Sequence, residues 1–167
     1  MPRPLTAILI GAGDRGYAAY GPYALQHPEE LRFVAVAEPH TARRLRFSQA
    51  HNIPPERQFV SWEDLLEVGR IADAALVTTM DRLHFAPTSA ALLCGYDVLL
   101  EKPMATTLAD CVGLVQIAEE SGRLLQICHE MRYTNFFTTL QAVLDSGCLG
   151  EIITVEYREN LVYWAQG

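Results

Sequence analysis

Short, nearly continuous apolar runs recur along most of this 167-residue chain. They cover residues 5–10, 33–37, 74–77, 98–100 and 124–127. Runs of this length and continuity are typical of strands that are buried on both faces, as in a parallel sheet covered by helices. The pattern therefore predicts that each run is a strand of one parallel sheet.

The segments between the runs have helical spacing and their own start and stop signals. Ser61, with Asp64 three residues later, resembles a capping box, and Gly122 and Gly147 are stop signals for the helices before them. We predict helices at residues 15–26, 41–50, 62–67, 83–93, 107–120 and 134–145. Strands that alternate with helices predict an α/β fold with a doubly wound parallel sheet, the Rossmann fold.

The pattern changes after Glu151. Residues 152–158 have polar side chains interleaved with apolar ones, which predicts a strand in a sheet with one wetter face. We therefore expect a dinucleotide-binding Rossmann domain at residues 1–148 and the first strand of a second α/β domain at residues 149–167. The second domain would continue beyond Gly167, so this chain is expected to be a truncated piece of a longer protein.

Composition narrows the function classes. The formal charge of -7, without a basic patch, argues against binding of nucleic acid. No apolar run approaches about 18 residues and no basic-then-apolar leader comes before the first strand, so we expect neither a membrane protein nor a secreted one, but a cytoplasmic one. The four cysteines form no CxxC pair, which predicts reduced, mostly buried thiols.

A glycine-rich turn, GAGDRG, separates the first strand from the first helix. Gly11 permits the tight turn, Gly13 lets the backbone approach a pyrophosphate, and Gly16 lets the helix pack closely on the sheet. The helix N-terminus adds N–H donors and a partial positive charge. The turn as a whole is therefore a predicted phosphate-binding loop, comprising Gly11, Gly13, Asp14, Arg15 and Gly16.

Glu38 ends the next strand and is the predicted ribose-binding acid. Its carboxylate can accept hydrogen bonds from both adenosine ribose hydroxyls and would repel a 2'-phosphate, so NAD is favoured over NADP. Arg43 and Arg44 weigh against this preference if either reaches a 2'-phosphate, although a solvated helix face is the simpler interpretation of both.

Polar residues follow two later strands at the edge where cofactors bind in such folds. Thr78, Thr79 and Met80 follow one strand directly and are predicted to run along the cofactor. His84 begins the next helix, either as a cofactor contact or as an N-terminal polar residue. A metal site is not predicted: His129 and Glu130 lack the second histidine of an HExxH pattern.

Glu101 and Lys102 end another strand, and Pro103 follows them. A lysine beside a cationic nicotinamide would have its charged form disfavoured, which suits acid/base work or the holding of a substrate oxygen. Lys102 is therefore the predicted catalytic residue, and both Glu101 and Lys102 are predicted to bind the cofactor. The alternative is an exposed ion pair. Arg132, after the last strand, could reach substrate or a cofactor phosphate.

The glycine turn, the EKP sequence at 101–103 and the later segment SGCLGEI together resemble the Gfo/Idh/MocA family of NAD(P)-dependent oxidoreductases. The resemblance implies hydride transfer with a sugar, polyol or related small molecule, bound by a second domain that often mediates oligomer contacts. It also implies that Gly11, Gly13 and Gly16 hold phosphate, Glu38 the ribose, Thr79 and His84 the cofactor loop, and Lys102 the substrate and nicotinamide.

Two departures from the family pattern stand out. Met80 occupies the usual proline position, and the acid/base histidine of the family's second domain is absent, so this chain alone is expected to be inactive. The turn also resembles that of NAD-dependent glycosidases, which use transient oxidation. Two further function classes have a similar glycine turn: a non-catalytic dinucleotide-binding module, which would need no Lys102, and an adenosylmethionine-dependent methyltransferase.

Overall fold

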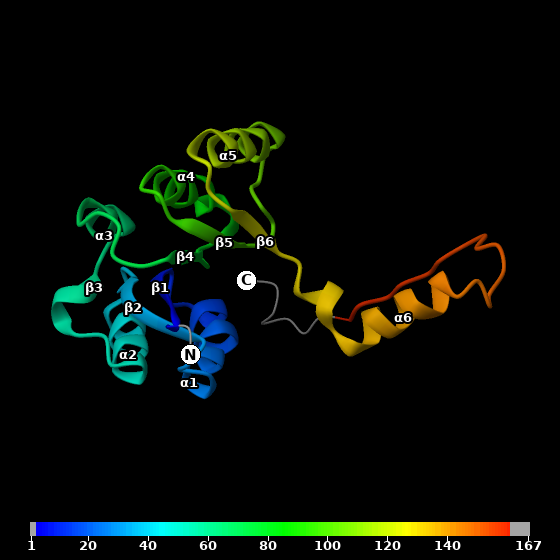
Figure 1. Ribbon diagram of the computed structural model, residues 1–167, viewed down its shortest axis with the longest axis horizontal. Coiled ribbons are helices and arrows are strands. Elements are labelled where there is room, and N and C mark those ends of the chain that lie inside the picture. Colours follow the sequence, from blue (N-terminus) through cyan, green and yellow to red (C-terminus); the bar gives the residue numbers. More distant parts are fainter. Residues whose placement is uncertain (1–2, 161–167) are drawn as a thin grey trace. The chain divides into compact units, whose positions relative to one another are not determined.

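The computed structural model describes residues 3–160 and contains one six-stranded parallel sheet with the order β3-β2-β1-β4-β5-β6 (Figure 1). The strands are β1 (Leu5–Ile10), β2 (Leu31–Ala37), β3 (Gln58–Phe59), β4 (Ala74–Val77), β5 (Asp97–Glu101) and β6 (Leu125–Cys128). The chain winds outward from β1 to β3 and then returns to β4 on the other side of β1. The predicted doubly wound sheet is confirmed, and its switch point lies between β1 and β4.

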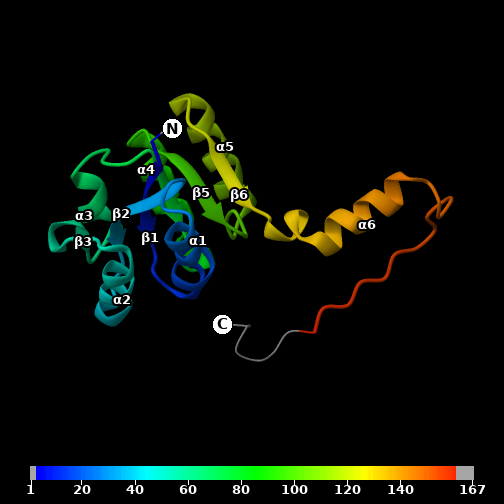
Figure 2. The same cartoon turned by 60° about the horizontal axis from the view of Figure 1, so that its bottom comes forward.

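Helices cover both faces of the sheet (Figures 1 and 2). One face carries α1 (Gly21–Gln26) and α2 (Thr41–His51), and the other carries α3 (Trp62–Glu67), α4 (Phe85–Leu93) and α5 (Leu108–Ser121). Short 3₁₀ turns are η2 (Pro55–Arg57), η3 (Asp81–Leu83) and η4 (Glu130–Tyr133), and α6 (Asn135–Asp145) follows η4. In the described residues, no helix is both long and apolar enough to cross a membrane.

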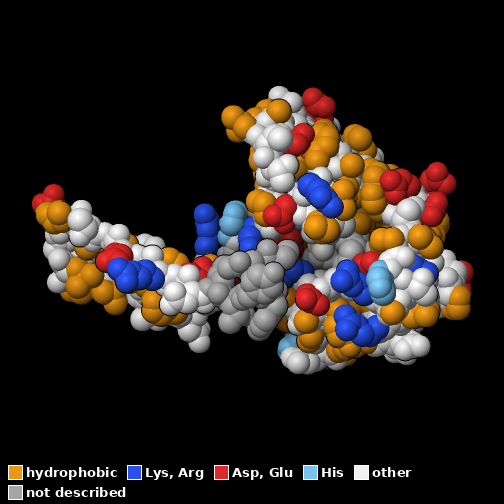
Figure 3. All heavy atoms as spheres, turned by 180° about the vertical axis from the view of Figure 1, so that it is seen from behind, with side chains coloured by type: hydrophobic (Ala, Val, Ile, Leu, Met, Phe, Trp, Pro, Cys, Tyr) orange, Lys and Arg blue, Asp and Glu red, His pale blue; other side chains and the backbone are white. Residues whose placement is uncertain are grey.

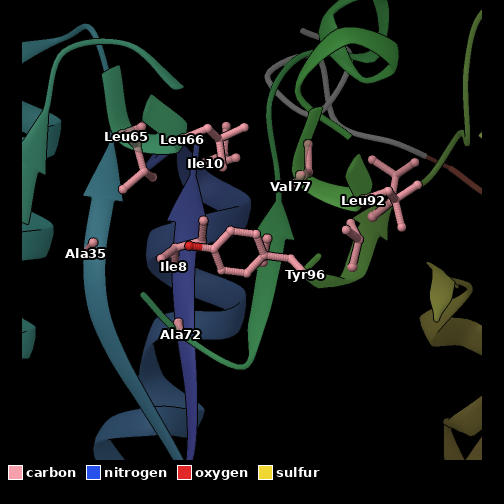
Figure 4. Packing of buried hydrophobic residues seen from close by; sticks show 14 of the residues in the cluster. Ile8, Ile10, Ala35, Leu65, Leu66, Ala72, Val77, Leu92 and Tyr96 are labelled. Atoms are coloured by element: carbon pink, nitrogen blue, oxygen red, sulfur yellow. The ribbon is translucent and has the colours of Figure 1, made fainter. Parts of the chain in front are cut away.

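Alternation along β1 builds a core on each face of the sheet. Ile8 and Ile10 belong to the cluster under α3, α4 and α5, whereas Ala7 and Leu9 belong to the cluster under α1 and α2. Tyr96 is fully buried beside Ile8 (Figure 4). Its hydroxyl donates to the Gly69 carbonyl at 3.1 Å and accepts from the Ile71 N–H at 2.9 Å, which satisfies the buried polar tip.

Most predicted helix boundaries agree with the structure to within two residues. The Ser61 hydroxyl accepts from the Asp64 N–H at 3.1 Å, so the predicted cap is confirmed. The predicted single helix at 15–26 is instead a π-helix, η1 (Arg15–Tyr20), followed by α1. Pro22 gives the physical reason, because it has no N–H to donate and its ring would crowd the Ala18 carbonyl of a continuous α-helix.

The last part of the described chain differs from the prediction. Residues 152–158 form no strand in the structure, and Ile153 and Val155 are more than three-quarters exposed. A strand requires a hydrogen-bonded neighbour, and no described residue pairs with this segment. Packing divides the chain into one compact unit ending at Cys128 and another beginning at His129. The predicted domain boundary at residue 148 stays a prediction, and residues 161–167 lie outside the described residues.

The prediction that the cysteines are mostly buried is wrong. Cys94, Cys111 and Cys128 are half-buried and Cys148 is exposed, so the cysteines are less buried than predicted. On the face shown in Figure 3, Lys and Arg side chains lie interspersed with Asp and Glu.

Candidate dinucleotide site

Strand register brings four predicted site residues into line at the carboxyl edge of the sheet. Ile10 of β1 lies opposite Ala37 and Val77, and Val77 lies opposite Leu100. The next residues along the four strands are Gly11, Glu38, Thr78 and Glu101. These residues come from separate parts of the sequence, and the parallel sheet brings them to its carboxyl edge: Glu101 is the last residue of β5, and the other three directly follow their strands.

The glycine turn is held against the end of β4. The Thr78 N–H donates to the Ile10 carbonyl at 2.9 Å, and the Thr78 hydroxyl donates to the Gly11 carbonyl at 2.5 Å. Thr78 is buried, so its side chain holds the glycine turn through this hydrogen bond and has little surface exposed to a ligand. In this structure Thr78 supports the glycine turn, and its predicted contact with a cofactor stays a prediction.

The three glycines of the turn have different surroundings. Gly11 has a φ of +96°, and a Cβ there would lie 2.9 Å from the Thr78 carbonyl oxygen. A Cβ at Gly16 would lie 2.4 Å from the Gly11 carbonyl oxygen, so helix η1 can approach the turn only with glycine there. A Cβ at Gly13 would meet nothing within 4 Å. Gly13 therefore keeps open a space that the fold itself does not use, which fits an approaching pyrophosphate.

The Glu38 carboxylate is buried and accepts from two backbone N–H groups, one in the glycine turn and one two residues after Glu38. Its Oε2 accepts from the Ala12 N–H at 2.8 Å and its Oε1 from the His40 N–H at 2.9 Å. Each carboxylate oxygen has a second lone pair, so each can also accept a hydrogen bond from a ribose hydroxyl. The Arg44 guanidinium donates to the Glu38 carbonyl at 2.6 Å, which commits it to the backbone and supports a structural role for that side chain.

Lys102 is exposed, whereas Glu101 beside it is buried. Glu101 Oε2 accepts from the Lys102 N–H at 3.0 Å, and Oε1 accepts from the Tyr20 hydroxyl, also at 3.0 Å. Tyr20 is a site residue that the sequence pattern did not predict. The available signal was its position four residues after Gly16, which puts both residues on the same side of a helix.

His84 joins the two loops that carry Thr79 and Lys102. Its ring has no exposed surface, and Nδ1 lies 2.6 Å from the Pro103 carbonyl oxygen while Nε2 lies 3.1 Å from that of Thr79. Thr79 is half-buried and its hydroxyl donates to the Leu83 carbonyl at 3.1 Å, whereas Met80 is exposed. The position of the His84 ring favours a role in holding the loops over direct contact with a cofactor.

We expect His84→Leu to lower the free energy of unfolding by about 1–3 kcal/mol, because it removes the fully buried ring that contacts the part-buried Thr79 and Pro103 carbonyl oxygens, to one of which the ring N–H of a neutral imidazole donates. His84→Asn should recover about 1 kcal/mol, since its amide can replace the Nδ1 contact. Urea unfolding followed by circular dichroism measures both. The exposed His40→Leu is the control and should change stability by less than about 0.5 kcal/mol. Equal losses in the two His84 variants would contradict the carbonyl-bridging role.

Three further sequence candidates fall outside the first compact unit. His129, Glu130 and Arg132 belong to the second compact unit. Among the described residues, one group has the side-chain proximity needed for a metal site, namely His27, Glu29 and Glu30. That group precedes the amino end of β2, at the opposite edge of the parallel sheet from the glycine turn. It therefore takes no part in the candidate site.

A family model described as an oxidoreductase family with an NAD-binding Rossmann fold matches residues 5–129. The chain belongs to the Gfo/Idh/MocA oxidoreductase family. The resemblance carried by the glycine turn and the EKP sequence is thus confirmed. Members of this family are oxidoreductases, and membership assigns the chain to that class of enzyme.

The names of two similar proteins describe enzymes that act on a polyol or a sugar nucleotide. The scyllo-inositol 2-dehydrogenase (NADP(+)) of Bacillus subtilis is 27% identical over 157 residues, 91% of this chain and 40% of that protein. The dTDP-3,4-didehydro-2,6-dideoxy-alpha-D-glucose 3-reductase of Streptomyces antibioticus is 30% identical over 156 residues, 91% of this chain and 45% of that protein. The chain therefore spans less than half the length of these Gfo/Idh/MocA relatives.

Solved structures share the fold. An oxidoreductase from Agrobacterium radiobacter, in complex with NAD+, L-tartaric acid and magnesium, matches with a TM-score of 0.77 at 24% identity, over 88% of this chain and 42% of that one. NAD+ in that complex and NADP(+) in the name of the inositol dehydrogenase show that similar proteins use either dinucleotide.

Proposed function

We propose that this chain is the NAD-binding part of an enzyme that transfers hydride between the nicotinamide and a hydroxyl-bearing carbon of a sugar or polyol. The observation that carries the proposal is the open space at Gly13, beside a buried Glu38 and on the same sheet edge as Lys102. In this proposal the pyrophosphate would occupy the open space at Gly13, and the adenosine ribose would lie at Glu38.

Each group has a definite task in this proposal. The turn from Gly11 to Gly16 would bind the pyrophosphate with backbone N–H groups, and Glu38 would accept from the adenosine ribose. When bound, the nicotinamide supplies the hydride chemistry. The Lys102 ammonium would hold the substrate oxygen and stabilise negative charge on it, while a base from outside this part of the enzyme takes the hydroxyl proton. Thr79 is proposed to support the cofactor loop.

We propose NAD as the preferred dinucleotide because of the charge and fixed position of Glu38. The carboxylate is held by two backbone N–H groups, so it cannot easily turn away from a 2'-phosphate, and the two negative charges would repel. Arg44, which could otherwise neutralise that phosphate, donates to the backbone instead. Assembly into oligomers and a cytoplasmic location remain predictions from the sequence.

Calorimetric titration of the chain with NAD and NADP tests this function. We expect tighter binding of NAD, and Glu38→Gln should weaken NAD binding by about 1–3 kcal/mol, or roughly 5- to 150-fold, because a charged acceptor is lost. The same variant should reduce the discrimination against NADP. Glu29→Gln, an exposed acid at the opposite sheet edge, is the matched control and should leave both affinities unchanged. Tighter binding of NADP by the unmodified chain would refute the assignment.

A further inference from the structure

The Glu101 carboxylate links two parts of the candidate site. It is buried at the carboxyl end of β5, where Oε2 accepts from the Lys102 N–H and Oε1 accepts from the Tyr20 hydroxyl, each at 3.0 Å. The Arg15 Nε lies 3.9 Å from the same Oε1. One carboxylate therefore faces donors from two elements that are far apart in the sequence.

Those two elements have distinct places in the site. Arg15 and Tyr20 are the first and last residues of η1, the helix that begins at the glycine turn. Lys102 follows β5 directly. Through Glu101, the backbone of the lysine is tied to the helix that would carry the pyrophosphate.

Tyr20 is suited to act as a permanent donor in this link. Burial, more than any other cause, raises the pKa of the Tyr20 hydroxyl, and the Cys128 thiol and the Glu101 charge raise it further. The hydroxyl therefore stays protonated and can donate to Glu101 across the physiological pH range. Because Tyr20 is half-buried, the bond is also partly shielded from water.

We infer that Tyr20 and Glu101 are positioning residues that fix the backbone of Lys102 relative to the η1 helix. This inference rests on the proposed role of Lys102. A lysine side chain has several rotatable bonds and a large rotamer entropy, so its ammonium is placed reproducibly only if its backbone is fixed. Glu101 thus acts through Lys102, and its buried carboxylate need not contact the cofactor. The link also makes the position of the lysine dependent on the helix that binds phosphate.

Hydrogen exchange at the Lys102 amide, measured by NMR without any ligand, tests the inference. We expect Tyr20→Phe to raise the exchange rate of this amide about tenfold relative to that of Ile8 in β1, because Glu101 loses the donor that orients it. Glu101→Leu removes the acceptor and should raise the ratio further, whereas Glu101→Gln keeps an acceptor oxygen and should lie between Glu101→Leu and the unmodified chain.

The matched control is Tyr23→Phe, which removes another tyrosine hydroxyl that donates to a carboxylate, that of the exposed Glu30. It should leave the Lys102 amide unchanged. Normalising to Ile8 separates a local effect from general loosening of the sheet. An unchanged ratio of Lys102 to Ile8 exchange in Tyr20→Phe would overturn the inference, as would an equal increase in Tyr23→Phe.

Addition of NAD separates this inference from the proposed function. We expect NAD to shift the Lys102 amide resonance in the unmodified chain, and Tyr20→Phe to reduce that shift while changing NAD affinity less than about threefold. If the unmodified chain does not bind NAD, the proposed function fails, but the ligand-free exchange ratio still decides whether Tyr20 positions Lys102. If NAD binds and Tyr20→Phe leaves the shift unchanged, only the positioning inference fails.

Discussion

Gly13→Ala should abolish most dinucleotide binding while leaving the fold intact, whereas Gly16→Ala should damage the fold. The φ of Gly13 lies outside the left-handed region and a Cβ there meets nothing within 4 Å, so alanine fits the ligand-free chain. The new methyl group would occupy the path of the pyrophosphate. We expect a loss of roughly 10- to 100-fold in NAD affinity, or about 1.4–2.8 kcal/mol.

Gly16→Ala is the matched variant within the same turn. Its methyl group would lie 2.4 Å from the Gly11 carbonyl oxygen, and both partners are backbone that cannot move without shifting β1 or η1. We expect the free energy of unfolding to fall by about 3 kcal/mol, as for an overpacked interior. Urea unfolding and NAD titration of both variants check this. The same affinity for NAD in Gly13→Ala and the unmodified chain would contradict the phosphate-loop assignment.

Lys102→Ala should reduce turnover far more than it reduces cofactor binding. Lys102 is exposed at the end of β5, so its loss should not unfold the chain. An ammonium that stabilises charge at the reacting oxygen contributes about 10²- to 10³-fold to the rate, by analogy with other electrostatic groups in active sites. We therefore expect a drop of that size in kcat, with the dissociation constant for NAD changed less than about threefold.

Steady-state kinetics of the intact enzyme, with a polyol or sugar found by screening, measure this effect. Lys102→Arg keeps the positive charge but alters its geometry, so it should recover only part of the rate. If the dissociation constant for NAD rose sharply while kcat stayed constant, Lys102 would be a cofactor anchor and the proposed hydride-transfer role would be wrong.

Five of the six described strands could be predicted from local pattern because they read as short apolar runs, whereas the two-residue, half-buried β3 carries no such run and was missed. The ends of those runs also located Gly11, Glu38 and Lys102 at one edge. The partners of the buried polar groups could not be read in this way. The link from Tyr20 to Glu101 spans 81 residues, and the bridge from His84 to Pro103 spans 19. Both depend on side-chain directions that are set only when the sheet assembles.

At residues 152–158 the sequence predicted a strand that the structure does not contain. The interleaved pattern of this segment is typical of a strand, yet in the described structure the segment forms none, because a strand is defined by a partner and not by its own sequence. The π-helix at 15–20 was missed because its cause, Pro22, lies beyond it in the following helix. Periodicity predicts which face of a helix or strand is apolar, but not which hydrogen bonds its backbone makes.

Two-dimensional ¹H–¹⁵N NMR of the chain during titration with NAD tests the central claim most directly, because it reports both binding and place. We predict saturable shifts concentrated in the turn from Gly11 to Gly16, at Glu38, and in the loops at Thr78–Thr79 and Lys102, with little change at the opposite sheet edge around Glu29. No saturable shift, or shifts centred on residues away from the carboxyl edge of the sheet, would contradict the assignment of a dinucleotide site there.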